Sequence, residues 1–142
     1  PDPLVRPAPR GAPSRREPNI QHRELEARIA GYNLAASRLF SELHTQTHWT
    51  IDELGTATST LADLATTRHD LNLYWRLLPE ESQARLTPLR SLDELIPLLA
   101  RRTAERRREL EKTATDSPRA AWELRRLDEV SRRLATLAPP RG

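Results

Sequence analysis

Two histidines, His44 and His48, stand four residues apart in the stretch HTQTH. At this spacing a helix presents both imidazoles on one face, as in the HExxH pattern of zinc-dependent proteases. Thr45 takes the position of the protease base, and a zinc site needs further ligands. The nearest are Asp52 and Glu53, which are better explained as acids in the first turn of a following helix. We therefore predict solvated or capping histidines and no metal site, with His44, His48 and Asp52 as the residues to test.

A run of basic residues between Arg101 and Lys112 is the second pattern that bears on function. On a helical wheel Arg101, Arg108 and Lys112 share one side, with Glu105 between them. A phosphate-binding surface keeps acids away from its cations, because each neutralised phosphate adds to the affinity. Interleaved charges are equally typical of a solvated helix with i, i+3 and i, i+4 ion pairs. We interpret the run as a solvated face, with nucleic acid and an acidic protein as the alternative partners.

The last predicted helix carries two further candidates for contact with a partner. Trp122, beside Arg125 and Arg126, lies away from the apolar stripe of this helix. It can stack on a base or anchor in a partner's pocket, whereas the simpler interpretation is that it covers the preceding helix near the turn. Leu127 lies on the apolar stripe, and the facing helix offers little apolar cover beyond Leu99. The sequence therefore indicates that Leu127 is a contact for a missing partner.

The remaining sequence contains no pattern of an enzyme. It has no cysteine, no Ser/His/Asp set, no glycine-rich phosphate loop and no nucleotide-binding motif. We predict a non-enzymatic protein without a cofactor.

The composition favours helices over strands. Of the 142 residues, 37% are hydrophobic and only 4% are aromatic, and valine occurs only at Val5 and Val130. Strands draw on β-branched and aromatic side chains, so this chain lacks the material for a sheet. The length is near that of one domain.

Apolar residues recur every three or four positions through two long segments, which is typical of helices that pack along one stripe. The first stripe consists of Leu25, Ile29, Tyr32, Ala36, Leu39 and Leu43. We predict a first helix from Asn19 and a second that opens at a Thr50–Glu53 capping box and ends at Pro79. Tyr74 widens the apolar face of the second helix enough to contact two neighbours, which favours a bundle.

Two more helices are predicted in the carboxyl half. Ser91 and Glu94 form a capping-box pattern before the third helix, and Ser117 followed by Pro118 is a cap with a proline at the first helical position. The predicted fold is all-α, a bundle of about four main helices arranged as two antiparallel hairpins. It spans residues 19–138, between a disordered, Pro- and Arg-rich arm at 1–18 and a linker at 139–142.

The charge differs between the two halves of the chain. Residues 20–96 hold seven cations and eleven acids, and residues 97–142 hold twelve cations and seven acids. No stretch approaches the ~20 apolar residues of a membrane span, so we expect no membrane contact and favour the cytoplasm. The leading hypothesis is a helical protein–protein interaction, scaffold or oligomerisation module within a larger protein or complex. The alternative is a nucleic-acid-binding module that uses the basic carboxyl third.

Overall fold

The computed structural model describes residues 16–113 and 117–137, and it is helical wherever it has regular structure. The helices are α1 (Arg16–Thr45), α2 (Ile51–Arg76), α3 (Glu80–Arg85), α4 (Leu95–Thr113) and α5 (Pro118–Leu137). The described residues contain no strand, so the all-α prediction is confirmed. Most of the predicted arm and the predicted carboxyl linker lie outside the described residues.

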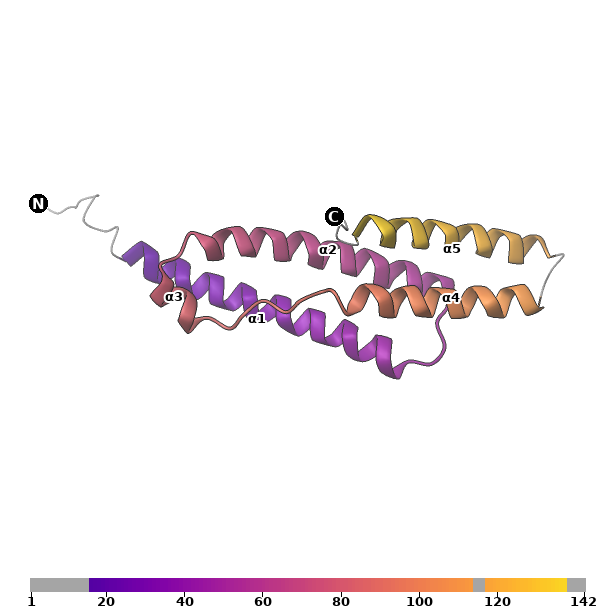
Figure 1. The fold of residues 1–142 in the computed structure, drawn as a ribbon, viewed down its shortest axis with the longest axis horizontal. Helices are drawn as coiled ribbons and strands as arrows, with labels where there is room; N and C mark the ends of the chain where they lie inside the picture. Colours follow the sequence, from indigo (N-terminus) through magenta and orange to yellow (C-terminus); the bar gives the residue numbers. More distant parts are fainter. Residues whose placement is uncertain (1–15, 114–116, 138–142) are drawn as a thin grey trace, which may run out of the picture.

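The four long helices pack against one another in an elongated assembly (Figure 1). α1 contacts α2, α4 contacts α5, and α2 also packs on both α4 and α5, while α1 contacts α4. Figure 1 shows the chain reversing its direction from each long helix to the next. It also shows α4 and α5 displaced towards one end of the molecule, so the start of α1, the end of α2 and the short α3 lie at the other end.

The first helix begins earlier than the sequence predicted. α1 starts at Arg16, three residues before the predicted start at Asn19. Pro18 then falls in the first turn, where its missing N–H is tolerated because no intrahelical acceptor is available there. The sequence pattern had placed the proline outside the helix.

The start of α2 is fixed by the predicted capping box. The Glu53 N–H donates to Thr50 Oγ1 at 3.1 Å, and the Thr50 N–H donates to Glu53 Oε1 at 2.9 Å. These two bonds satisfy amide groups that a helix end leaves without partners. The Thr50–Glu53 prediction is confirmed.

We expect the capping box to make stability pH-dependent through Glu53. The hydrogen bond from the Thr50 backbone is the main reason that the pKa of Glu53 lies below its ordinary value of 4.5. A carboxyl group with a lowered pKa stabilises the fold above its unfolded pKa, and the contribution is lost as pH falls through the folded pKa. The variant Glu53→Gln keeps an acceptor oxygen but cannot ionise. Urea unfolding should therefore show a stability difference between wild type and variant at neutral pH that disappears in acid. An equal difference at both would contradict this role.

Of the two helix caps predicted in the carboxyl half, the structure confirms one and contradicts the other. Ser117 Oγ accepts from the N–H groups of Arg119 and Ala120 at 3.2 and 3.4 Å, so the predicted start of α5 is confirmed. Ser91 Oγ instead accepts from the Asp93 N–H at 3.1 Å, and α4 begins only at Leu95. The predicted box at the start of the third helix was wrong because the chain makes a separate turn before α4.

The core follows the predicted stripes of the long helices. Every member of the α1 stripe is buried, together with most of the matching apolar residues of α2, α4 and α5. Those of α5 are Ala120, Leu127, Val130 and Leu134. Burial of this apolar surface is the main force that holds the helices together.

Residues 86–94, here called the α3–α4 connection, are tied to α1 by hydrogen bonds to the main chain. Asn33 Oδ1 accepts from the Arg90 N–H at 2.8 Å, and Asn33 Nδ2 donates to the Pro88 carbonyl at 3.1 Å. Tyr32 Oη donates to the Arg90 carbonyl at 2.6 Å, and Arg68 Nε on α2 donates to the same oxygen at 3.2 Å. The connection, which has no regular structure, therefore satisfies its polar groups on the two flanking helices.

The side chain of Arg90 also holds the α3–α4 connection on α1. Its Nη1 donates to Ser37 Oγ at 3.1 Å, and its guanidinium lies 4.6 Å from the centre of the Phe40 ring. Burial raises the pKa of Tyr32 to about 12 against the opposing effects of Arg68 and Arg90. Tyr32 therefore stays a donor at neutral pH, and its contribution to stability is lost only as pH rises from the unfolded pKa through the folded one.

Candidate functional site

The structure separates the two histidines of HTQTH. α1 ends at Thr45, so His44 lies in its last turn, 4.3 Å from Phe40 between ring centres, whereas His48 lies in the connection to α2. The i, i+4 helical geometry required for shared metal binding is therefore absent. Asp52 lies in the first turn of α2, as the sequence indicated. Across residues 16–113 and 117–137, no three His, Cys, Asp or Glu side chains come together in a way that could hold a metal ion.

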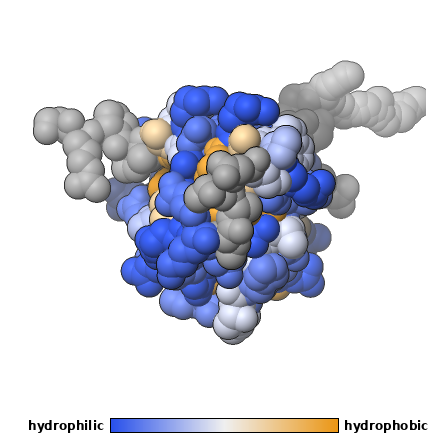
Figure 2. Space-filling view, turned by 90° about the vertical axis from the view of Figure 1, so that its right-hand side faces the viewer, coloured by the Kyte–Doolittle hydropathy of each residue, from blue (hydrophilic) through white to orange (hydrophobic). Residues whose placement is uncertain are grey.

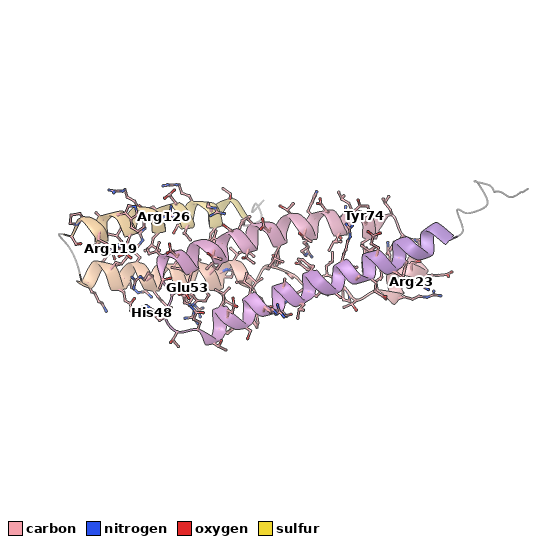
Figure 3. All side chains as sticks on the ribbon, turned by 180° about the vertical axis from the view of Figure 1, so that it is seen from behind. Arg23, His48, Glu53, Tyr74, Arg119 and Arg126 are labelled. Carbon is pink, nitrogen blue, oxygen red and sulfur yellow. The ribbon has the colours of Figure 1, made fainter. Side chains whose placement is uncertain are left out.

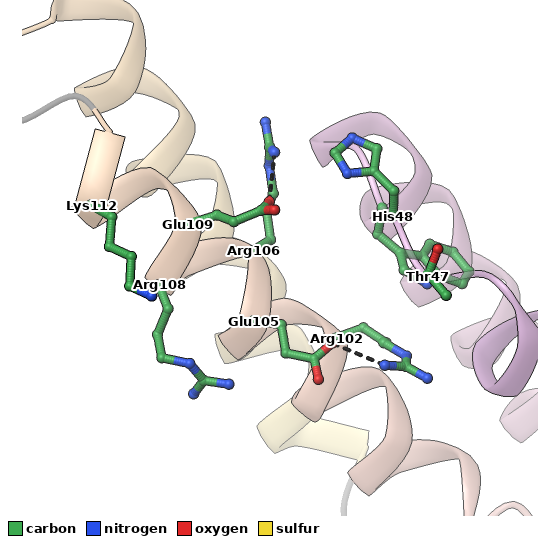
Figure 4. A pocket seen from close by; sticks show the side chains of 9 residues that line it. Thr47, His48, Arg102, Glu105, Arg106, Arg108, Glu109 and Lys112 are labelled. Atoms are coloured by element: carbon green, nitrogen blue, oxygen red, sulfur yellow. Dashed lines mark hydrogen bonds and ion pairs between the residues drawn. The ribbon is translucent and has the colours of Figure 1, made fainter.

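A pocket of about 410 Å³ lies between α4 and the α1–α2 connection (Figure 4). His48 and Thr47 line one side, and charged residues of α4 line the other. Arg102 Nη1 contacts Glu105 at 2.9 Å, and Arg106 Nη1 contacts Glu109 at 3.1 Å. Two of the pocket's four cations are thus already paired with its two acids, whereas Arg108 and Lys112 form no ion pair among the described residues.

Arg102 also caps the end of α1. Its Nε donates to the Leu43 carbonyl at 2.8 Å, in the last turn of that helix. A cation at this position satisfies a free carbonyl group and interacts favourably with the helix dipole. Figure 4 shows Arg102 reaching towards the α1–α2 connection, while Arg108 and Lys112 extend from the other side of α4.

Two further arginines of the basic run bind α4 to α5. Arg106 Nη2 lies 3.6 Å from Glu123, and Arg107 forms an ion pair with Asp128. The basic run of α4 therefore has two parts: some of its arginines bind neighbouring helices, and the other cations are exposed to solvent. Arg101, Arg108 and Lys112 belong to the solvated part, and no ion pair holds them among the described residues.

The outer face of α5 carries an exposed tryptophan between two arginines. Trp122 is 43% exposed, and the guanidiniums of Arg119 and Arg126 lie 5.8 and 5.7 Å from its ring centre. Trp122 is therefore a partly exposed side chain outside the main core. Arg125 is also exposed on this helix. Figure 3 shows Arg119 and Arg126 on α5, far from Tyr74 along the molecule.

The prediction that Leu127 stays uncovered is wrong. Leu127 is 0% exposed and belongs to the main core. The sequence argument considered only α4 as its cover, but α5 packs on α2 as well. Leu127 is therefore not available to a partner in this fold.

The described residues also expose an apolar surface near the end of α2 that the sequence interpretation had not singled out. Leu73, Tyr74 and Leu77, here called the α2 apolar cluster, are 49%, 56% and 80% exposed. The sequence indicated that Tyr74 widens the apolar face of the second helix enough to contact two neighbours, and α2 does pack on α1, α4 and α5. Tyr74 itself lies near the end of α2, away from α4 and α5 (Figures 1 and 3). Two pockets of about 410 and 750 Å³ adjoin the cluster, and Arg28 lines both.

The α2 apolar cluster stands out against the rest of the surface. Hydrophilic residues cover most of the opposite end of the molecule, the end seen in Figure 2. In the sequence the cluster is visible as three large apolar residues within five positions, all outside the buried apolar stripe of α2.

Arg119 was also missed as a candidate residue by the sequence analysis, although it lies three residues before Trp122 and thus on the same side of the helix.

Within its described part, the chain has no helix whose length and apolar content suffice to span a bilayer. Comparisons with protein-family models, with curated proteins and with solved structures find no match to this chain.

Proposed function

We propose that this chain is a non-enzymatic helical interaction module that self-associates through the α2 apolar cluster. Its helices are proposed to form two antiparallel hairpins, α1 with α2 and α4 with α5. The displacement of the second hairpin leaves one end of α1 and α2 free for contact with another molecule. In this role the chain serves as a scaffold or oligomerisation element within a larger assembly.

The observation that carries this proposal is the joint exposure of Leu73, Tyr74 and Leu77 on one helix end. Single exposed apolar residues are common on protein surfaces and need no explanation. Leu34, which is 55% exposed on the face of α1 opposite its buried stripe, is such a case. Three adjacent large side chains beside two pockets are typical of an interface.

The charges around the cluster favour a second copy of the chain as the partner. Glu24 and Arg28 line one adjoining pocket, and Arg28 and Asp70 line the other. Both signs of charge therefore border the same apolar centre. Glu24 already pairs with Arg28 of its own copy at 2.9 Å, so in a two-fold symmetric contact Asp70 of each copy can face Arg28 of the other, which makes such a surface self-complementary.

We expect Leu77→Asp to abolish self-association without affecting the fold. The side chain is largely exposed, so the free energy of unfolding of the monomer should change by less than about 0.5 kcal/mol. In the complex the variant loses the burial of a leucine and must desolvate a carboxylate, so the dimer should weaken at least about a hundredfold. Size-exclusion chromatography with light scattering over a range of concentrations measures this.

Leu34→Asp is the matched control, because it places the same carboxylate at a similarly exposed leucine outside the cluster. It should assemble like the wild type. A wild-type protein that stays monomeric at the highest concentration tested rules out self-association. Equal effects of the two variants would show that the interface lies elsewhere.

A further inference from the structure

A second surface, separate from the α2 apolar cluster, lies along the outer face of α5. The helix carries five arginines, and all of them are exposed: Arg119, Arg125, Arg126, Arg132 and Arg133. Two of its three acidic residues face arginines of α4, since Glu123 lies beside Arg106 and Asp128 pairs with Arg107. Only Glu129 remains on the outer side, 3.8 Å from Arg126. Packing against α4 thus separates the charges of α5 and leaves a cationic outer face.

This separation distinguishes α5 from the basic run of α4. On α4, Arg102 and Arg106 are paired with Glu105 and Glu109 at the surface. The charges there stay interleaved, as the sequence indicated. A surface that binds phosphates needs cations without competing acids, because affinity grows with the number of phosphates neutralised. α5 fulfils this condition better than α4 does.

Trp122 lies in the middle of the cationic face. Arg119 and Arg126 are seven residues apart, about 10 Å along the helix axis at ~1.5 Å per residue, and the indole lies between them. Their guanidiniums lie within about 6 Å of the ring centre, which is the range of a cation–π contact and holds the ring in place. A base that stacks on the indole displaces a guanidinium from the face of the ring, and the arginines on the two sides of Trp122 are then close to the flanking phosphates.

We propose that the outer face of α5 binds single-stranded nucleic acid, with a base stacked on Trp122 and phosphates at Arg119 and Arg126. Single strands expose the faces of their bases, whereas a duplex hides them in its own stack. An acidic polypeptide matches the arginines, but only a nucleic acid strand carries a planar ring next to every negative charge. The exposed aromatic side chain among the cations therefore favours the single strand.

The test is fluorescence anisotropy of a labelled oligothymidylate of about 16 nucleotides, titrated with the full chain over a series of salt concentrations. Trp122→Leu should weaken binding about tenfold and leave the salt dependence unchanged, because it removes stacking and no charge. Trp122→Phe should retain most of the affinity. Arg119→Gln combined with Arg126→Gln should reduce the slope of log K against log salt by about 1.4, at ~0.7 for each phosphate contact on a single strand.

Arg101→Gln combined with Arg108→Gln is the matched control, since it removes two exposed cations from α4. It should leave both the affinity and the slope near the wild-type values. All these positions are exposed, and circular dichroism verifies that each variant is folded. The proposal is overturned if no binding occurs, if the α4 variant acts like the α5 variant, or if a duplex or polyglutamate binds as tightly as the single strand. Equal binding by the Leu and Phe variants excludes stacking on Trp122.

Discussion

Replacing Leu127 by Asp is expected to unfold the protein. Leu127 is fully buried on α5, which packs on α2 and α4, and the residues around it are apolar. A carboxylate there loses its hydration and finds no cation, so the cost should be about 4 kcal/mol or more. Since a whole domain is stable by only about 5–15 kcal/mol, this removes much of its stability. Thermal unfolding followed by circular dichroism measures the effect.

Two variants show whether burial is the cause. Leu127→Ala leaves a cavity without a charge and should lower the free energy of unfolding by about 3 kcal/mol while the fold persists. Leu34→Asp adds the same charge at an exposed leucine and should have almost no effect. A Leu127→Asp protein with the melting temperature of the wild type would show that α5 does not bury this stripe against α2 and α4.

Replacing Asn33 by Ala is expected to destabilise the protein by about 1.3 to 2 kcal/mol. The change removes both hydrogen bonds that hold the α3–α4 connection through Asn33, and each is worth about 1 kcal/mol. Alanine is also a better helix former than asparagine, by up to ~0.7 kcal/mol, which partly offsets the loss. Urea unfolding measures the net change.

Asn72→Ala corrects for this helix propensity. Asn72 is a half-buried asparagine within α2 that makes no hydrogen bond through its side chain in the described residues, so its replacement reports the propensity alone. It should leave stability unchanged or raise it slightly. If both variants have the same stability, the bonds of Asn33 to the connection contribute nothing.

The local features of this fold could be predicted because they depend on neighbouring residues. Thr50 caps α2 because Glu53 lies one turn away, and Ser117 caps α5 because its hydroxyl reaches the next amide groups. The buried stripe of α1 follows directly from the spacing of its apolar residues. Such patterns hold wherever the helix is later placed.

Features that depend on the placement of whole helices could not be read from the sequence. Leu127 is buried because α2 reaches α5, and Tyr74 is exposed because α4 and α5 lie towards the other end of the molecule. Arg102 looked like one charge in a basic run, yet it caps a helix more than fifty residues away in the chain. The charged face of α5 likewise appears only when Glu123 and Asp128 are seen to turn towards α4.

The attachment of the α3–α4 connection has a consequence for how this chain can evolve. Asn33 and Tyr32 bind the main chain of Pro88 and Arg90, and every residue type except proline offers the same amide and carbonyl groups. Drift at an exposed position such as Thr87 therefore leaves these bonds intact, whereas a change at Asn33 removes two of them. Substitutions should therefore accumulate unequally, with the exposed positions of the irregular segment free to vary and Asn33 constrained, while the buried Leu86 and Leu92 stay apolar.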